Sequence, residues 1–228
     1  VFKDTITGLA AGVRLTSNNM LHKGDWITVK SVDANGIVED MSLTTVKVRN
    51  FDNTIVTISP ITLVNGSFQN WIGMQKSGGR RVKRVVYFDF RSVRLVDETL
   101  KRNLLAKHFA TEDSFKLKES LQKAIDKDIQ EGKDIEDLKN PAALAPTNLQ
   151  LYRKFMEKYL RQRPEVNTDV TLMVRHIEAT QCGLPIEFYF FIKDKVWVNY
   201  EHILADIMEH AYALANEFGL KIYEQYPE

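Results

Sequence analysis

The segment from Thr44 to Arg81 limits the possible folds more than any other part of the chain. Its first half alternates Val and Ile with Thr, Lys and Arg, which is typical of strands with one buried face. Phe51 to Thr54 is predicted to be a turn between two such strands, because Asp and Asn side chains bond their own backbone. Gly66, Gly73 and the pair Gly78-Gly79 then interrupt the sequence ahead of a basic strand. The segment predicts short antiparallel strands and carries no catalytic motif.

Further short strands are expected on either side of this turn. Asn35-Gly36 is a strong signal for a tight turn between the first two strands. Five short strands at such spacing predict a small β-barrel. The expected strands cover 25–30, 36–41, 44–49, 54–59 and a last one near 67–71.

The second half of the chain alternates strands with longer helices. Asp97 is a plausible N-cap for a helix, and Gly219 is a good residue to end one. The order strand-helix-strand-strand-helix-strand is the ferredoxin-like pattern, so the fold class is α+β. The expected strands are 82–90, 170–177, 186–192 and 220–223, and the expected helices are 97–107, 148–163 and 200–218. The charged segment 110–147 is an insertion that we expect to carry a surface helix.

Composition and charge narrow the function. The chain has 228 residues and 44% hydrophobic content, which suffices for one large core or two small ones. A formal net charge of +1 gives no overall field that favours nucleic acid or an anionic membrane. A single cysteine, Cys182, excludes an internal disulfide. No run of residues approaches the ~20 apolar residues that span a bilayer.

Three side chains on one helix face suggest a metal site at first sight. His202, Asp206 and His210 are spaced four residues apart, and histidine and carboxylate bind zinc or iron. The first and last of them lie about 12 Å apart along a helix, however, which is too far for one ion. A solvated helix face is therefore the favoured interpretation, and neither a metal nor a cofactor is expected.

The N-terminal segment Val1 to Leu15 has helical spacing and two glycines, Gly8 and Gly12, around Ala11. Each glycine inside a helix costs roughly 1 kcal/mol relative to alanine, so propensity alone does not explain them. A close contact with a neighbouring helix does explain them. The alternative is an ordinary helix that packs on its own domain.

A basic cluster follows the glycine-rich turn and leaves two interpretations open. Its residues lie close to Phe68 and Trp71, an arrangement that also occurs in RNA-binding proteins. Near-neutral charge and the lack of an RNP-type pattern on this strand argue against RNA, and an exposed linker is the simpler alternative. The cluster comprises Lys76, Arg80, Arg81, Lys83 and Arg84.

The glycine-punctuated stretch, its NWIGM and SGGRR motifs and the N-terminal helix together resemble the cytoplasmic part of MscS-like mechanosensitive channels, in particular the miniconductance branch. The resemblance implies that residues 1–20 are the end of a pore-lining helix and that 21–75 form a Sm-like β domain. It further implies that 76–228 form a ferredoxin-like α/β domain, with the insertion at about 110–147. That insertion departs from the simplest family pattern.

The resemblance also implies a function. The chain would be the vestibule of a homoheptameric, non-enzymatic channel of the inner membrane, located in the cytoplasm, with membrane-spanning segments upstream of Val1. Tension would open it to release ions and solutes during hypo-osmotic shock. Its partners would be identical copies, lipid and permeating ions, without nucleic acid. The alternative is a soluble RNA-binding or scaffold protein built from the same two domains.

The resemblance implies site residues, namely Gly8, Ala11 and Gly12 for pore-helix packing, Lys3 and Asp4 for the pore mouth, and Arg80, Arg81 and Lys83 for the opening between the domains. Phe68, Trp71 and Ile72 follow the last predicted strand of a barrel that is too small to bury much by itself, so we expect a subunit interface there. For Trp71 a second reading remains open, in which the ring closes the end of its own barrel.

Overall fold

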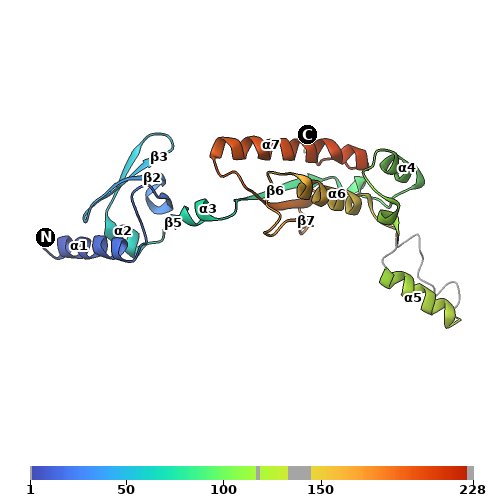
Figure 1. Ribbon diagram of the computed structural model, residues 1–228, viewed down its shortest axis with the longest axis horizontal. Helices are drawn as coiled ribbons and strands as arrows, with labels where there is room; N and C mark the ends of the chain where they lie inside the picture. Colours follow the sequence, from blue (N-terminus) through green and yellow to red (C-terminus); the bar gives the residue numbers. More distant parts are fainter. Residues whose placement is uncertain (1, 117–118, 133–144, 225–228) are drawn as a thin grey trace. The chain divides into compact units, whose positions relative to one another are not determined.

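A computed structural model describes residues 2–116, 119–132 and 145–224. The chain divides into two compact units, Val1–Ser77 and Gly78–Glu228 (Figure 1). Each unit contains one antiparallel sheet with its own hydrophobic core, so the fold is a mixed α/β one. Parts of the insertion that we expected at 110–147 lie outside the described residues.

Unit 1 contains a five-stranded sheet in the order β4-β3-β2-β1-β5. All pairs are antiparallel, and the five predicted strands are present. The predicted turn at 51–54 is confirmed, since Asp52 Oδ1 accepts the Thr54 backbone N–H at 2.9 Å and Asn53 has φ 69°. The strands are β1 (Trp26–Val29), β2 (Ala34–Met41), β3 (Val46–Asn50), β4 (Ile55–Ile58) and β5 (Gln69–Asn70).

The turn predicted at Asn35-Gly36 is wrong. Both residues lie inside β2, and the chain reverses earlier through the 3-10 turn η1 (Lys30–Val32) and the left-handed Asp33. Asn35 pairs with Thr28 in the β1–β2 register. Gly36 is instead required by close strand packing, because a Cβ there would overlap the carbonyl oxygen of Arg49 on β3.

Helix α1 (Phe2–Ser17) packs on the short helix α2 (Pro60–Asn65) in unit 1. Leu15 of α1 joins the core of this unit, together with Ile27, Val38 and Val48 from the sheet, and all four are fully buried. A second short helix, α3 (Ile72–Lys76), follows β5. The sequence pattern did not predict α2 or α3.

Unit 2 contains a three-stranded sheet in the order β6-β8-β7. Its strands are β6 (Arg80–Phe88), β7 (Met173–His176) and β8 (Leu184–Ile192), and β8 pairs with both neighbours along an antiparallel register. The last strand expected, at 220–223, is reduced to a single bridge between Ile222 and Phe88. Two backbone hydrogen bonds flank the bridge, from Asp89 N–H to the Lys221 carbonyl and from Tyr223 N–H to the Tyr87 carbonyl.

The helices of unit 2 begin and end close to the predicted positions. Asp97 caps α4, since its carboxylate accepts the Leu100 N–H at 2.7 Å, and Thr147 caps α6 in the same way through Gln150. Gly219 ends the last helical segment with φ 67°. The helices are α4 (Glu98–Ala106), α5 (Glu119–Gln130), α6 (Asn148–Gln162) and α7 (Trp197–Ala215), with 3-10 turns η2 (Phe90–Ser92), η3 (Glu112–Phe115) and η5 (Asn216–Phe218).

The core of unit 2 lies where α6, α7 and the sheet meet. Tyr152 is fully buried on α6, and its ring meets Phe88 and Phe218 edge to face at 5.2 and 5.6 Å. Its hydroxyl donates to the Ala211 carbonyl at 2.6 Å, and burial raises the pKa of this phenol. Tyr152 therefore joins both helices and the sheet while its polar atom stays satisfied.

A polar clasp joins the chain on either side of α4 and α5. Asn148 is fully buried, donates to the Ser92 carbonyl at 2.8 Å and accepts the Arg94 N–H at 3.0 Å. Its own N–H donates to the Arg94 carbonyl at 3.0 Å, and a bridge pairs Leu95 with Thr147. Residues more than fifty positions apart in sequence are thereby held side by side.

Candidate functional site

The two residues expected at the pore mouth, Lys3 and Asp4, lie in α1. Their side chains fall outside the described part of the structure. On the described part of α1, Ile6, Leu9 and Val13 are exposed by 64%, 43% and 51%. Since these apolar residues follow helical spacing, one face of α1 presents an apolar stripe that its own chain leaves uncovered.

The two glycines of α1 have different surroundings. Gly12 is buried, and a Cβ there would overlap the carbonyl oxygen of Leu43 in the β2–β3 turn. Ala11 beside it is only 6% exposed. A Cβ at Gly8 would meet nothing within 4 Å. The need for glycine at position 12 thus has a cause inside this chain, in line with the alternative of a helix that packs on its own domain, and the roles expected for Gly8, Ala11 and Gly12 between helices stay predictions.

Of the three residues expected at a subunit interface, Trp71 belongs to an aromatic group. Trp71 stacks on Trp26 with ring centroids 4.8 Å apart, and its Nε1 donates to Thr28 Oγ1 at 3.0 Å. Phe51 meets Trp26 edge to face at 5.3 Å. Phe68 packs against the core of unit 1. Trp71, Phe68 and Ile72 each remain half-buried, so each retains surface that a second chain can cover.

The basic residues at the start of β6 are engaged within unit 2. The guanidinium of Arg80 lies over the Tyr200 ring, 4.3 Å from its centroid. The Tyr200 hydroxyl donates to the Arg81 carbonyl at 3.1 Å, and burial raises the pKa of that phenol. The Arg81 guanidinium lies 6.0 Å from the centroid of the Tyr189 ring. The start of β6 is therefore tied to α7 and β8.

The buried carboxylate of Glu187 joins Lys83, the third cation expected at the opening between the domains, to the sheet of unit 2. Glu187 on β8 is 1% exposed, and its Oε1 accepts a hydrogen bond of 2.8 Å from Arg175 Nε on β7 and forms an ion pair with Arg175 Nη2 at 2.8 Å. Lys83 Nζ on β6 lies 3.7 Å from the same carboxylate. This ion network across three strands was not predicted from the sequence, where one acidic residue in the apolar run 184–192 is the feature that indicates it. Lys83 thus has a structural partner in addition to the role predicted for it.

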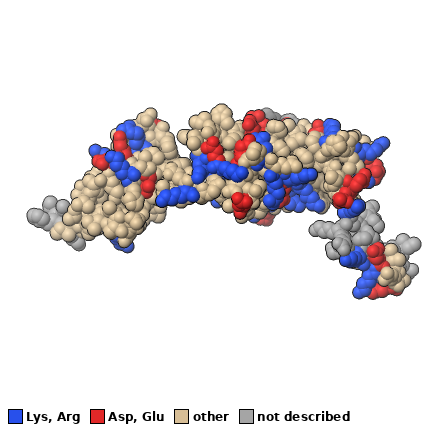
Figure 2. Space-filling model, viewed as in Figure 1, with Lys and Arg blue, Asp and Glu red and all other residues tan. Residues whose placement is uncertain are grey.

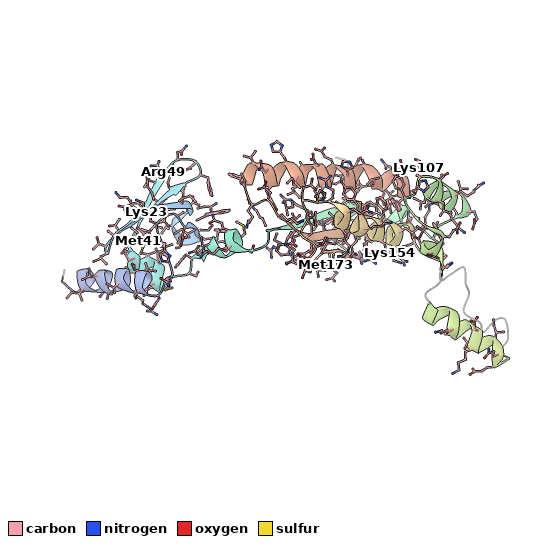
Figure 3. All side chains as sticks on the ribbon, in the orientation of Figure 1. Lys23, Met41, Arg49, Lys107, Lys154 and Met173 are labelled. Carbon is pink, nitrogen blue, oxygen red and sulfur yellow. The ribbon has the colours of Figure 1, made fainter. Side chains whose placement is uncertain are left out.

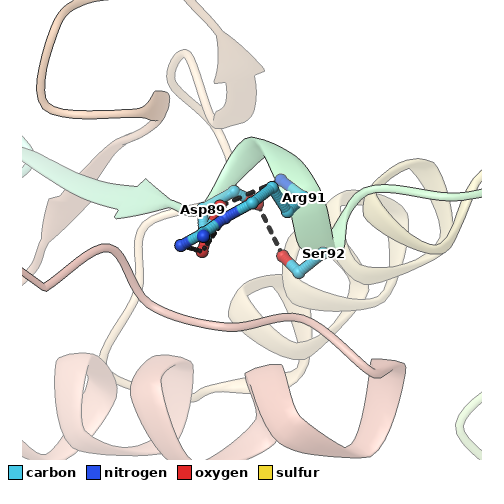
Figure 4. Close-up of polar contacts among 3 residues, drawn as sticks. All are labelled: Asp89, Arg91 and Ser92. Atoms are coloured by element: carbon cyan, nitrogen blue, oxygen red, sulfur yellow. Dashed lines mark hydrogen bonds and ion pairs between the residues drawn. The ribbon is translucent and has the colours of Figure 1, made fainter.

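A second basic region lies at the end of β6 and is neutralised locally. Asp89 accepts hydrogen bonds from the Arg91 backbone and guanidinium, and the Ser92 hydroxyl donates to the Asp89 carbonyl at 2.7 Å (Figure 4). The Arg91 side chain holds the pKa of Asp89 below its usual value. Asp89, Arg91 and Arg94 line a hollow of about 410 Å³. Arg94 is paired with Asp97. Both arginines therefore have carboxylate partners already.

The histidines that suggested a metal do not form one site. His202, Asp206 and His210 are all exposed on α7. His210 Nδ1 lies 2.7 Å from the Asp206 carbonyl, and its ring stacks on Tyr159 at 5.8 Å. No group of three metal-binding side chains occurs among the described residues. In Figure 2, basic and acidic side chains are interspersed on the face shown.

No helix within the described ranges is long and apolar enough to cross a bilayer. The residues described above lie in two separate units. The apolar face of α1 and the half-buried aromatics belong to unit 1, and the cations at the start of β6 belong to unit 2.

Comparison with known proteins finds similar sequences. Residues 4–73 match the family described as mechanosensitive ion channel, beta-domain. An uncharacterized MscS family protein of Aquifex aeolicus is 33% identical over 108 residues, which is 46% of this chain and 28% of the relative. The small-conductance mechanosensitive channel MscMJ of Methanocaldococcus jannaschii is 32% identical over 68 residues, 30% of this chain and 19% of that channel.

Solved structures extend the likeness to both units. The cryo-EM structure of Arabidopsis thaliana MSL1 matches 96% of this chain and 59% of its own length, with a TM-score of 0.60 and 10% identity. The closed-state crystal structure of Helicobacter pylori MscS matches 99% of this chain and 65% of its own length, with a TM-score of 0.59 and 14% identity. At such identity the likeness concerns the fold. Residues 4–73 therefore match the β-domain of mechanosensitive ion channels, and the chain is similar to MscS family proteins while it spans less than a third of the length of the curated relatives it matches.

Proposed function

We propose that this chain forms the end of the pore-lining helix and the cytoplasmic vestibule of a channel that opens under membrane tension and releases ions and solutes during hypo-osmotic shock. The observation that carries the proposal is the match of residues 4–73 to the β-domain of mechanosensitive channels. The fold likeness to two members over nearly the whole chain supports it. The function is one of oligomeric geometry, and no enzymatic activity is expected.

The proposed architecture assigns residues 1–20 to the pore helix, 21–75 to a Sm-like β domain and 76–228 to a ferredoxin-like domain. Five antiparallel strands in the order β4-β3-β2-β1-β5 support the Sm-like β domain. The ferredoxin-like domain is supported by the β6-β8-β7 order together with the bridge from Ile222 to Phe88, which places the last segment beside β6. Ferredoxin-like sheets have the same neighbours.

Assembly is proposed to be a homoheptamer in the inner membrane, with this region in the cytoplasm and membrane-spanning segments upstream. A closed ring needs heterologous contacts, in which each surface meets a different surface of the next copy. The apolar stripe of Ile6, Leu9 and Val13 on α1 supports such a contact, since an uncovered apolar face stays exposed at a cost. Lys3 and Asp4 are proposed to lie at the pore mouth, and Arg80 and Arg81 beside the openings through which ions pass.

The test combines function and assembly. The protein that carries this chain would be expressed in cells without tension-activated channels of their own, followed by patch recording and survival of osmotic downshock. We expect tension-dependent currents and improved survival. Native mass measurement of the purified protein should give a ring-sized oligomer. A functional null result together with a monomeric mass would refute the proposal.

An RNA-binding or scaffold function is the second candidate. The observation in its favour is that Tyr189 and Phe191 on β8 lie side by side, 5.9 Å apart, with Arg81 near Tyr189. Alternate residues of a strand share one face, so these rings could stack bases. Binding of single-stranded RNA to a monomeric protein, lost in Tyr189→Ala, would favour this function over the channel.

A further inference from the structure

A hollow of about 310 Å³ in unit 2 lies between α6 and the turn that follows α4. We call its large apolar lining residues, Phe109, Leu151 and Phe155, the floor. We call its ionisable lining residues, His108, Lys154 and Lys158, the rim, and the lining is completed by Ala110, Thr111, Ser114 and Gln162. The volume is at the lower end of the range of small-molecule sites. Nothing in the proposed channel function uses this hollow.

The floor is held in place by the core. The rings of Phe109 and Phe155 meet edge to face at 5.2 Å. Both rings also contact Phe218, at 6.0 and 5.6 Å, and Phe218 is fully buried. Phe109 and Phe155 are themselves half-buried, so part of each ring faces the hollow. The result is a preformed apolar surface rather than a gap between mobile side chains.

The two lysines of the rim lie on one side of the floor. Lys154 and Lys158 are one helical turn apart on α6, and both are exposed (Figure 3 marks Lys154). Within the described part of the chain neither forms an ion pair, and no acidic residue lines the hollow.

Nearby carboxylates are already engaged elsewhere. Glu112 and Asp113 pair with Lys101 and Lys116, and Glu157 on α6 pairs with Arg161. Among the residues that the structure describes, no carboxylate therefore pairs with the two ammonium groups of the rim.

The turn that supplies the rest of the rim has an unusual residue at its tightest point. His108 has φ 59°, and the N–H groups of His108 and Phe109 donate to the carbonyls of Leu105 and Leu104, which closes the end of α4. Glycine is the usual residue in this left-handed position, because a side chain strains it. A histidine here directs attention to its side chain, which lines the hollow.

We propose that the hollow binds a small amphiphilic carboxylate, with its apolar body on Phe109 and Phe155 and its carboxylate at Lys154 and Lys158. Two donors at one end and aromatic carbon at the other match such a ligand in both charge and polarity. The site is contained within unit 2 and does not depend on channel assembly, so it can be tested on the 228-residue chain.

The experiment is calorimetric titration of the chain with octanoate and, separately, with the uncharged 1-octanol. We expect one octanoate per chain and weaker binding of octanol. Lys154→Gln and Lys158→Gln should each weaken octanoate binding by about tenfold, as expected for loss of one charge-assisted hydrogen bond. Neither change should alter octanol binding. Both lysines are exposed and unpaired, so both variants should fold, as circular dichroism can verify.

Two further variants separate a binding role from a structural one. Lys47→Gln, which removes an exposed lysine of β3, should leave octanoate binding unchanged. His108→Gly should raise the thermal unfolding midpoint, because glycine fits the turn, while it weakens octanoate binding. The proposal is overturned if octanol binds as tightly as octanoate, or if the α6 lysine variants bind like the unmodified chain. It is also overturned if Lys47→Gln has the same effect as they do.

Discussion

At the residue scale, the two glycines of α1 have different packing environments. Gly12 and Gly8 lie one turn apart in α1, yet only Gly12 touches the backbone of another segment. The sequence shows both as helix-weakening residues and cannot distinguish them, because the contact with Leu43 comes from a turn thirty residues later. Gly36 gives the same lesson, since its dipeptide predicts a turn while its packing against Arg49 places it in a strand.

Alanine substitution should separate the two glycines. Gly8→Ala should stabilise the chain by up to ~1 kcal/mol, because alanine favours a helix and the new methyl group has open space. Gly12→Ala should destabilise it instead, because the methyl group must displace the Leu43 backbone. Urea unfolding of the two variants measures both effects. Equal changes in the two would mean that the contact with Leu43 does not exist in solution.

At the element scale, periodicity predicted most strands and helices but not the groups that join them. Alternation located the five strands of unit 1, and Asp97 and Gly219 located the start of α4 and the end of the last helical segment. The network around Glu187 was not predicted, because its partners come from strands that are adjacent only in the folded sheet. For the same reason the sequence could not show that Arg80 would lie over Tyr200.

The network around Glu187 should contribute measurably to unit 2. Glu187→Gln removes the charge that Arg175 and Lys83 face, and we expect a loss of about 2 kcal/mol in the free energy of unfolding. The loss should be smaller than for a fully buried pair, since both cations reach solvent. Lys83→Gln, which removes only the longer contact, should cost less than half as much. A larger loss in Lys83→Gln than in Glu187→Gln would contradict this order.

The cap of α4 predicts a pH dependence. The Leu100 N–H, followed by Arg94, holds the pKa of Asp97 below its usual value, so the folded state favours the carboxylate. The stabilisation is present above the unfolded pKa of about 4 and is lost as pH falls through the lower folded value. Asp97→Asn keeps the capping oxygen without this titration. The difference in unfolding midpoint between the two proteins should therefore shrink on acidification, and a constant difference would contradict the prediction.

At the scale of the whole molecule, the half-buried aromatics connect folding to assembly. Trp71 has partners in its own chain, Trp26 and Thr28, and retains exposed surface beside Phe68 and Ile72. A single chain cannot show whether this surface is covered by a neighbour, because that depends on residues of another copy. The interface role of these residues therefore stays a prediction.

Substitution of Trp71 should reveal that role. We expect Trp71→Ala to weaken the oligomer by about 2 kcal/mol or more per interface, as is typical of aromatic anchors. Trp71→Phe keeps the stacking on Trp26 and should retain most of the affinity. Sedimentation at several concentrations gives the dissociation constant, and thermal melting reports on the fold. An unchanged dissociation constant with a lower melting temperature would assign Trp71 to the core alone.

The clasp around Asn148 affects which part of this protein can change in length during evolution. Ser92 and Arg94 are hydrogen-bonded directly to Asn148. The chain segment between Arg94 and Asn148 therefore contributes little to holding these residues together. Lengthening such a path is inexpensive, at roughly 0.6 kcal/mol for each doubling of a flexible loop. The region that contains α5 can therefore gain or lose length while the sheet keeps its register, whereas α4 is tied to the core of unit 2 by the buried Leu100 and Leu104. Variation in length among relatives should be concentrated there, between two fixed anchor points.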